Sequence, residues 1–497
     1  MVERPRKVVI IGAGIAGLCA GVYAQRSGYD ALVLEQHHGA GGLAASWRRG
    51  DYTFETCLHW LVGTNPAGQF HALWNEVFDI DKLRFIHPEI FVRLETGHGE
   101  ALNVYTNIDR LEAEFLKRAP QDAVEIRRYA SAVRRMTGFA IPDPGASWPG
   151  RALAALRLVP LLPLWRHWTS ITCAQEGEKF RHPLIRHFFA GGGNAELAAI
   201  VLVMTLAWMS AHDGGYAIGG SQAIIRPIVE RLNALGGQVR FGAGVKRIRV
   251  EQGKATGVEL ENGEIITADW VVSAADGHST IYQLLDGQFT GPAIDDAYKT
   301  RETFPSYLQV SLGVARDLSG QAGYVTRLLD DPIQLDPGTR LPELSFRFFH
   351  FDPTFAPPGK TAVTAFLPTR NAAYWTGLER KDHARYAAEK LRVAAAVIDV
   401  LDRCIPGVRK DVEIVDVSTP ATVIRLTRNW KGSMEGWLPT PASGFKPLAQ
   451  RLPGLDRFLM AGQWTAPGGG LPLGLMTARS AIKTMCRQDR VRFLGLG

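Results

Sequence analysis

The stretch Lys7-Val-Val-Ile-Ile-Gly-Ala-Gly-Ile-Ala-Gly-Leu-Cys-Ala-Gly21 decides the fold of this chain. Its β-branched run breaks at glycines and resumes with helical spacing, which predicts a strand, a tight turn and a helix ending near Gly28. Ala31–Glu35 then has the composition of a second buried strand. A strand–helix–strand unit of about 30 residues is typical of a parallel sheet, so we expect a dinucleotide-binding half-domain here.

The glycines of this turn follow the pattern Gly12-x-Gly14-x-x-Gly17. Gly12 permits the tight turn, Gly14 leaves room for a pyrophosphate, and Gly17 lets helix and strand pack closely. The helix N-terminus offers free N–H groups to phosphate. Glu35, at the end of the second strand, can accept hydrogen bonds from an adenosine ribose and would repel a 2′-phosphate. The pattern therefore predicts FAD or NAD and disfavours NADP.

A second glycine pair, Gly41-Gly42, bears on the choice between FAD and NAD. It can supply a second phosphate-side surface, with Ser46 and Arg48 or Arg49 nearby to add N–H groups and positive charge. Taken alone, the pair is equally well explained as an ordinary loop.

The C-terminal glycines favour the flavin. Residues 457–481 predict a strand, a loop with five glycines between Gly462 and Gly474, and a helix that begins near Pro472. The dipole at that helix N-terminus would stabilise the negative charge that appears on a flavin ring when it accepts hydride. We therefore expect FAD.

Composition limits the class of protein. The chain has 497 residues, 46% hydrophobic and 21% charged, with 56 Lys plus Arg against 49 Asp plus Glu. This is the composition of a folded chain of two or three domains. A net charge of +7 without a concentrated basic stripe predicts no nucleic-acid partner and is compatible with anionic lipid.

Cysteines and apolar runs bear on the compartment. The five cysteines are widely spaced, which indicates neither a disulfide framework nor a zinc site, and His182 and His187 lack ligand spacing, so we expect no metal. No export signal is recognised. The longest apolar run, Leu197–Ala211, has 15 residues, short of the ~20 that span a bilayer, and we expect core or tunnel wall. The expected location is cytoplasmic.

On these motifs the chain resembles the phytoene desaturase and carotenoid isomerase family of FAD-dependent oxidoreductases, which includes retinol saturase and belongs to the amine-oxidase-like flavoproteins. The resemblance covers nearly the whole chain. It is carried by the Gly12–Leu18 fingerprint, Glu35, Gly41-Gly42, Gly214–Ser221, Val245–Ile248, Lys254–Val258, Ala268–Ala274, Asp352–Gly359, Gly432–Trp437 and Gly462–Gly474.

The resemblance implies roles for individual residues. Val245 would contact adenine through its backbone, and the Gly462–Gly474 segment would cradle the flavin. Leu43, Gln463 and Glu55 depart from the Arg, Asp and Asp that many relatives carry. Motifs and resemblance together give the predicted cofactor-binding set: Gly12, Gly14, Ala16, Gly17, Glu35, Gln36, Gly41, Gly42, Leu43, Val245, Gly462, Gln463, Gly470, Leu471, Pro472 and Leu473.

The resemblance also implies a discontinuous FAD domain and a separate apolar substrate domain. Residues 76–215 show amphipathic helical segments without the strand–glycine–helix rhythm, and from Gly236 strand patterns resume, as if the chain returned to the first sheet. The predicted fold is α/β: a doubly wound, Rossmann-like FAD-binding domain from 1–75, 216–290 and 445–497, with a mixed α+β substrate domain from 76–215 and 291–444.

Catalytic candidates lie just after the second glycine pair. His59 can move a proton beside the flavin, because imidazole titrates near neutral pH, although a core histidine is equally well supported. Glu55 is a second acid/base candidate, for which orienting nearby groups is the stronger alternative. Cys57 suggests covalent flavin attachment, against which a buried, inert thiol is favoured. The stretch Cys57–Gly63 is similar to that of retinol saturases.

The predicted function is FAD-dependent redox chemistry on carbon–carbon bonds of an apolar polyene or lipid-like substrate, with desaturation leading and electrons passing to oxygen or a quinone. Isomerisation or retinol-saturase-like chemistry is the alternative, and an amine oxidase or a non-enzymatic lipid-binding flavoprotein is more distant. Leu153–Trp168, with apolar bulk and basic edges, predicts either peripheral contact with the inner face of a membrane or a tunnel wall. The oligomeric state is left open.

Overall fold

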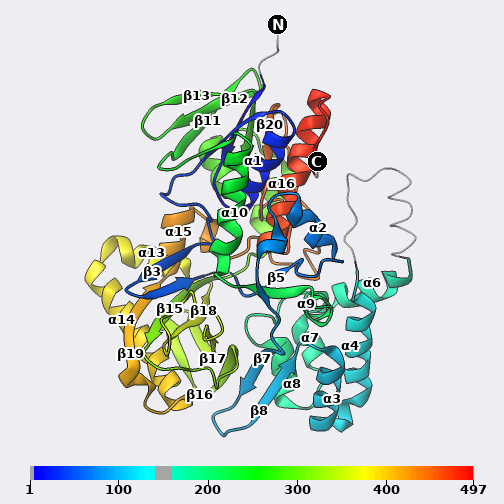
Figure 1. Cartoon of the computed structure of the whole chain (residues 1–497), viewed down its shortest axis with the longest axis vertical. Helices are drawn as coiled ribbons and strands as arrows, with labels where there is room; N and C mark the ends of the chain where they lie inside the picture. Colours follow the sequence, from blue (N-terminus) through cyan, green and yellow to red (C-terminus); the bar gives the residue numbers. More distant parts are fainter. Residues whose placement is uncertain (1–4, 57, 140–158, 496–497) are drawn as a thin grey trace.

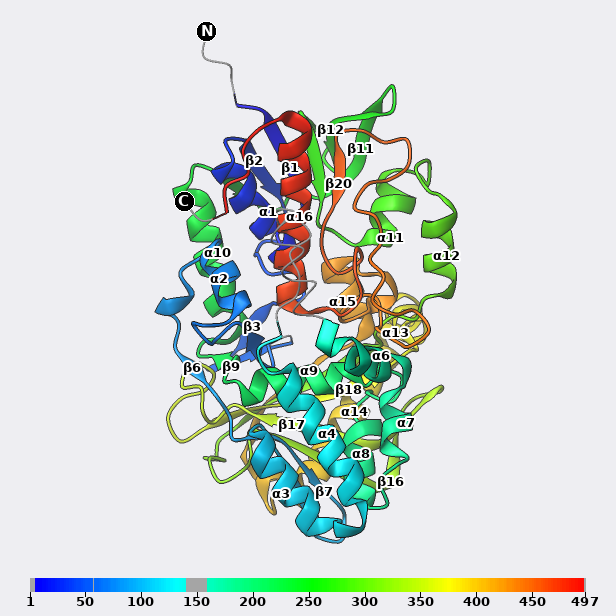
Figure 2. The same ribbon diagram turned by 90° about the vertical axis from the view of Figure 1, so that its right-hand side faces the viewer.

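The computed structural model describes residues 5–56, 58–139 and 159–495. Figure 1 separates two halves along the long axis: one contains a parallel sheet, the other a larger and mostly antiparallel sheet with a group of helices beside it. Figure 2 shows helix α16 (Gly470–Asp489) running down the first half toward helix α9 (Ile200–Ser210), which lies in the middle of the molecule.

The parallel sheet belongs to the first half. Its core strand β1 (Lys7–Ile11) is a buried β-branched run, which suits a sheet covered on both faces. Helix α1 (Ile15–Arg26) packs against α16 and against α10 (Gly220–Ala234). The predicted α/β, Rossmann-like fold is confirmed. In spatial order the strands are β10 (Gln238–Arg240), β2 (Asp30–Leu34), β1 (Lys7–Ile11), β14 (Trp270–Ser273) and β20 (Phe458–Met460).

These five strands lie within the three separated segments assigned from sequence to the FAD domain, whose boundaries remain predictions. One detail of that assignment is wrong. Only β10 and β14 of the returning segment join the parallel sheet, whereas β11 (Val245–Glu251), β12 (Lys254–Leu260) and β13 (Ile265–Thr267) form a separate antiparallel sheet. Short turns favour local hairpin pairing over insertion into a distant sheet.

The second half is organised on a seven-stranded sheet. Helices α13 (Ala372–Lys381) and α14 (His383–Cys404) contribute Trp375 and Val397 to a core that contains Val310 and Val363 from its strands. In spatial order the strands are β19 (Val412–Ser418), β15 (Ser306–Val314), β18 (Thr361–Thr369), β17 (Thr339–Phe348), β16 (Tyr324–Asp336), β7 (Ile90–Glu95) and β8 (Ala101–Tyr105).

Strands β7 and β8 correct the prediction of amphipathic helical segments over residues 76–215. They form a hairpin at the edge of the sheet, with β7 parallel to β16. Val92 and Leu94 are buried in alternation with more exposed neighbours, a pattern of period two that is short enough to be hidden among helical segments.

The other described residues of this range, 76–139 and 159–215, are largely helical, as expected. α9 is apolar on all sides and nearly all buried, which is typical of an interior helix. Its neighbours share one core with it: α3 (Ile108–Arg118), α4 (Ala123–Met136), α6 (Leu162–Ser170), α7 (Cys173–Gly177) and α8 (Pro183–Ala190).

Smaller elements connect the two halves. Strand β9 pairs with both β5 and β6, and the hairpin of β3 and β4 lies beside β18. The smaller elements are β3 (Ser46–Arg49), β4 (Tyr52–Glu55), β5 (Leu61–Val62), α2 (Gln69–Asn75), β6 (Phe85–Ile86), β9 (Gly214–Ala217), α11 (Gly277–Ser279), α12 (Pro292–Thr300) and α15 (Pro420–Thr427).

Within the described residues, no helix has the length and apolarity that crossing a bilayer demands.

Candidate functional site

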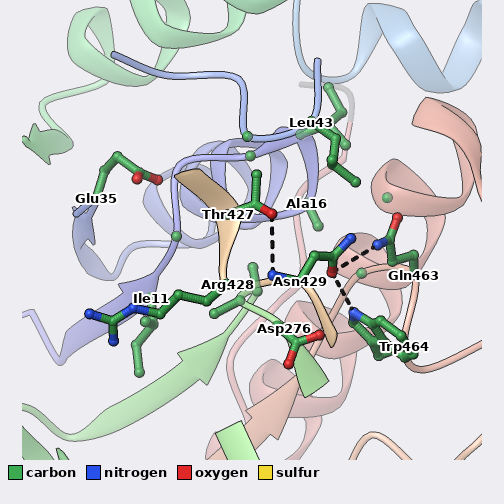
Figure 3. Close-up of a pocket in the computed structure, with 18 of the residues that line it drawn as sticks. Ile11, Ala16, Glu35, Leu43, Asp276, Thr427, Arg428, Asn429, Gln463 and Trp464 are labelled. Carbon is green, nitrogen blue, oxygen red and sulfur yellow. Dashed lines mark hydrogen bonds between the residues drawn. The ribbon is translucent and has the colours of Figure 1, made fainter. Parts of the chain in front are cut away.

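A pocket opens at the carboxyl ends of the parallel strands, where ligands bind in folds of this kind (Figure 3). Most of the predicted cofactor-binding residues line it, while Gly17, Pro472 and Leu473 do not. Those that do are Gly12, Gly14, Ala16, Glu35, Gln36, Gly41, Gly42, Leu43, Val245, Gly462, Gln463, Gly470 and Leu471.

The three glycines of the first turn are required for different physical reasons. Gly12 has a φ of +96°, and a Cβ on Gly17 would lie 1.8 Å from the carbonyl oxygen of Gly12, so both are fixed by the fold itself. Gly14 has an ordinary φ of −72°. A Cβ there would meet nothing closer than the Gly41 carbonyl oxygen at 3.9 Å. The space beside Gly14 is therefore left for a ligand.

Glu35 lies at the rim of the pocket and is 8% exposed. Its Oε2 accepts a hydrogen bond from the Ala13 N–H at 2.7 Å, and its Oε1 accepts one from the His37 N–H at 2.9 Å. These bonds fix the carboxylate, and its remaining lone pairs can accept from hydroxyl groups of a sugar.

The opposite wall contains a polar cluster that was not predicted from sequence. Asn429 Oδ1 accepts hydrogen bonds from Gln463 Nε2 at 3.2 Å and Trp464 Nε1 at 3.0 Å, and the Asn429 N–H donates to Thr427 Oγ1 at 3.2 Å (Figure 3). Asn429 and Thr427 lie in the stretch assigned to the substrate domain. The neighbouring Gly432–Trp437 motif was the available signal that this stretch reaches the cofactor.

Asp276 is a second unpredicted wall residue. Its carboxylate accepts from the Ser279 N–H at 2.7 Å and from the Trp430 N–H at 2.9 Å. Burial raises its pKa to about 6, and these backbone hydrogen bonds act in the opposite direction. Asp276 therefore joins the end of β14 to the 427–430 segment across the pocket.

The positive charge near the pocket comes from a different residue than expected. Arg49 pairs with Asp416, with 2.8 Å between Nε and Oδ1, and neither Ser46 nor Arg48 lines the pocket. Arg428 lines it instead and pairs with Glu261. The hairpin of β3 and β4 turns toward the large sheet, which carries Arg48 and Arg49 away from the glycine loop.

These features fit a dinucleotide with a flavin. No side chain caps the N-terminus of α1 or of α16, so the backbone N–H groups at both are available to a ligand. The first faces the open space beside Gly14. The second begins at Gly470, whose neighbour Leu471 lines both this pocket and the cavity next to it.

The adjoining cavity has a volume of about 740 Å³. Its walls are mainly aliphatic and aromatic, and α9 supplies Ile200, Val201, Met204 and Trp208. Pro472 and Leu473, predicted to bind the cofactor, line this cavity. A chamber of this kind accepts a long apolar ligand.

A third, smaller cavity of about 290 Å³ continues from it. The two share His59, Trp60, Leu197, Val201, Thr205 and Phe304, so they form connected space between α9 and the large sheet. Two partly buried ionisable residues, Arg347 and Glu343, line the third cavity and not the large one.

Glu435 was also not singled out from sequence, yet it is the one described residue that lines the dinucleotide pocket and both cavities. It packs over the glycine that precedes α16: a Cβ on Gly469 would lie 2.7 Å from Glu435 Oε2. In the described chain it has neither a hydrogen bond nor an ion pair. Burial raises its pKa to about 7, so its carboxyl group can change protonation near neutral pH.

His59 lines both cavities, and its ring centroid lies 6.3 Å from that of Phe366. Burial, and then the positive charge of Arg347, lower its pKa well below the ordinary range. The argument that this imidazole titrates near neutral pH is therefore wrong, because the ring is neutral there. Its role in catalysis stays a prediction.

Glu55 lies outside the pocket and both cavities. It is 3% exposed. Its Oε2 accepts from the Ser221 N–H at 2.7 Å, at the start of α10. This geometry agrees with the orienting alternative. Burial raises the pKa of Glu55 to about 7, and its acid/base role stays a prediction.

Two other predictions concern residues in or near undescribed stretches. Cys57, considered for covalent attachment, lies outside the described residues. Of Leu153–Trp168, only residues from 159 onward are described, and there Leu161, Leu162 and Trp165 line the large cavity. That supports the tunnel-wall interpretation for the described part.

Comparison with known proteins agrees with this geometry. Residues 15–482 match the family model for flavin containing amine oxidoreductases. The lycopene-forming phytoene desaturase of Pseudescherichia vulneris is 24% identical, with 97% of this chain and 99% of that protein aligned. The chloroplastic prolycopene isomerase of Arabidopsis thaliana is 24% identical, over 98% of this chain and 84% of that protein.

Solved structures share the fold. An oxidoreductase from Methanosarcina mazei superposes with a TM-score of 0.62 at 15% identity, over 96% of this chain and all (100%) of the other. Cyclohexylamine oxidase from Brevibacterium oxydans gives a TM-score of 0.61 at 14% identity, over 98% and 100%. At these identities the likeness concerns the fold alone.

Proposed function

We propose that this chain, which belongs to the flavin containing amine oxidoreductase family and is an FAD-dependent oxidoreductase, desaturates carbon–carbon bonds of an apolar polyene. One observation carries the proposal: the dinucleotide pocket shares Gly470, Leu471 and Glu435 with a largely apolar cavity of about 740 Å³. A polyene held in that cavity would lie against the start of α16. The curated relatives that act on phytoene or prolycopene add support.

In the proposed reaction, some residues bind the substrate and others move a proton. Bound FAD supplies a two-electron acceptor for a hydride from a substrate carbon. The α9 side chains exclude water and orient the chain, and Glu435 is placed to take the proton from the neighbouring carbon on its carboxylate oxygen. His59 contacts the same substrate as a neutral ring. The backbone N–H groups at the start of α16 stabilise negative charge at the pocket.

Isomerisation is the second candidate, because curated relatives of equal identity are named prolycopene isomerases. The two reactions separate by their electron balance. In an isomerisation, the electrons taken from the substrate return to it, and the product has the same composition. In a desaturation, the product lacks two hydrogens and the electrons leave to an acceptor.

The test uses the purified, flavin-loaded protein under anaerobic conditions. Phytoene and prolycopene are added in detergent, and the visible flavin absorbance is followed together with the product's spectrum. We expect flavin bleaching and a product with a longer conjugated system. A geometric isomer without bleaching would establish the isomerase alternative. Bleaching by simple amines, with no change in either polyene, would instead show an amine oxidase.

We also propose that the protein takes this substrate from a membrane surface. Val159 is 56% exposed and Leu162 is 45% exposed, beside Leu161 and Trp165 of the cavity wall. Flotation with anionic vesicles tests this. Val159→Asp should weaken binding, while the same change at Val124, 76% exposed on α4, should not. Equal behaviour of both variants, or no flotation of the wild type, contradicts the proposal.

A further inference from the structure

Arg347 on β17 forms no ion pair in the described chain, although the charge of the buried Glu55 acts on it. Its Nε is buried and has no hydrogen-bond partner, and no described carboxylate forms an ion pair with it. Its contacts are a long hydrogen bond from Nη1 to the His59 carbonyl oxygen at 3.5 Å and a position 4.4 Å from the centroid of the Tyr324 ring. Burial lowers its pKa, and the charge of Glu55 acts in the opposite direction. An uncompensated buried charge is unfavourable, and such residues are usually paired.

Neighbouring arginines of the same sheet show the usual arrangement. Arg93 on β7 and Arg327 on β16 both pair with Glu95, at 2.7 and 3.4 Å. Arg347 lies on the next strand, β17, and lines the third cavity. Of these three arginines, the one that lacks an ion pair is therefore the one that faces a cavity where a ligand can bind.

The surroundings narrow the chemistry of that ligand. Aromatic side chains, among them Phe91, Tyr324 and Phe366, form much of the wall. The other carboxylates on this cavity are Glu343, already held by His187 and the Gly192 N–H, and Glu435. Because Arg347 is the only cation described among these acidic residues, it suits a ligand group with a single negative charge, such as a carboxylate. A phosphate would need more hydrogen-bond donors.

We propose that Arg347 binds the carboxylate of a substrate whose apolar polyene chain lies in the large cavity. The inference rests on the proposed function, because it names the substrate class of the same site. The two cavities share His59, Thr205 and Val201, so one chain can run from Arg347 past Glu435. The substrate is then a polyene acid instead of a pure hydrocarbon.

Binding of a conjugated polyene acid tests the proposal without turnover. Parinaric acid, which becomes fluorescent in apolar surroundings, and its methyl ester are titrated into the flavin-loaded protein. The wild type should bind the acid about 10- to 100-fold more tightly than the ester. Arg347→Met should reduce acid binding to the level of the ester and leave the ester unchanged. High salt should preserve the preference, since buried pairs are weakly screened.

Arg327→Met is the matched control, since Arg327 lies on the adjacent strand and does not line the cavity. It should leave both affinities unchanged. Equal binding of acid and ester by the wild type, or a preference that survives in Arg347→Met, overturns this inference while ester binding still supports the apolar cavity. Absence of binding by either probe contradicts the proposed function itself.

A folding defect is separated by two measurements. Arg347→Lys keeps the charge and should retain part of the preference for the acid. Flavin content and the melting temperature are recorded for each variant. Without ligand, Arg347→Met should melt close to the wild type, because it loses no ion pair and only the long hydrogen bond to the His59 carbonyl oxygen and the contact with Tyr324. A clearly lower melting temperature in that variant would mean that the guanidinium has a structural role, and would overturn the proposal.

Discussion

The dinucleotide pocket and the apolar cavity beside it are built in opposite ways. The pocket is made largely from backbone: glycine turns, helix N-termini and a carboxylate fixed by two N–H groups. The cavity is made from side chains of α6, α9, the 58–62 segment and loops near residues 304 and 439. The first holds a ligand through groups that every residue has, and the second through the size and character of particular side chains.

This difference has a functional consequence. A backbone site changes little when side chains outside its glycines are replaced, so cofactor binding can persist while the substrate changes. A side-chain cavity can be altered one residue at a time without loss of the fold. The two meet at Glu435, Gly470 and Leu471, which line both, and Glu435 is the one ionisable residue among these three. Substitutions should therefore separate into loss of fold, loss of cofactor, loss of chemistry and change of substrate binding.

The largest effect is expected at Gly17. A Cβ there would lie 1.8 Å from the Gly12 carbonyl oxygen, which cannot move without opening the turn between β1 and α1. Gly17→Val should lower the free energy of unfolding by at least about 4 kcal/mol, and the protein should fail to accumulate in folded form. Expression and circular dichroism measure this. A folded variant that keeps its flavin would show that the turn is adaptable.

Gly14→Val should separate cofactor from fold. The backbone φ of −72° accepts any residue, and the nearest atom to the new Cβ would be 3.9 Å away. The free energy of unfolding of the flavin-free protein should change by less than about 1 kcal/mol. Flavin binding should be lost, because the side chain fills the space for the pyrophosphate. Retention of normal flavin absorbance would remove Gly14 from the binding site.

Glu435→Gln should impair the chemical step while the fold and flavin binding stay intact. The amide keeps the shape of the side chain and cannot take a proton, so turnover should fall about 10²- to 10⁴-fold at unchanged flavin content. In the wild type, a base with a pKa of about 7 gives a rate that rises with pH and levels off above that value. His59→Gln should retain this profile, because His59 is already neutral. A profile that disappears in His59→Gln and persists in Glu435→Gln would exchange the two roles.

The Glu435 carboxyl group also affects stability: Glu435→Gln should slow turnover and yet stabilise the folded protein above neutral pH. Burial raises its pKa from 4.5 to about 7, so the folded state binds the proton more tightly than the unfolded state. Between these values, rising pH therefore lowers the free energy of unfolding, by up to about 3 kcal/mol. Flavin-free Glu435→Gln lacks this loss and should melt higher than the wild type at pH 8. Equal melting temperatures would mean that the carboxylate is solvated or paired.

The pocket made from backbone could be predicted from sequence more fully than the cavity made from side chains. The glycine turn, Glu35 and the C-terminal loop could be predicted because each is a local pattern whose physical requirement is visible in a few adjacent residues. The edge hairpin β7–β8 was missed because its alternation is short and its pairing with β16 joins residues far apart in the chain.

The candidate site beyond the glycines was harder to predict. Glu435 depends on the approach of two distant loops at Gly469, and its raised pKa comes from burial, for which the neighbouring sequence gives no signal. The position of Glu55 behind α10 likewise depends on tertiary packing. His59 was expected beside the flavin by resemblance, whereas it lines the two cavities and not the dinucleotide pocket. Its lowered pKa comes first from burial and then from Arg347, which is distant in sequence.

The smallest effects should come from two valines on α9. Val203 is fully buried (0% exposed) in the core, whereas Val201, two residues earlier, lines both cavities. Val203→Ala should lower the free energy of unfolding by about 2 kcal/mol and leave polyene binding unchanged. Val201→Ala should destabilise less, because part of its surface already faces open space, and should weaken polyene binding about 3- to 10-fold. Urea unfolding and parinaric ester titration measure the two quantities on the same samples. If Val201→Ala destabilised the protein as much as Val203→Ala without altering binding, the α9 wall would be ordinary core, and the contrast between pocket and cavity would not hold there.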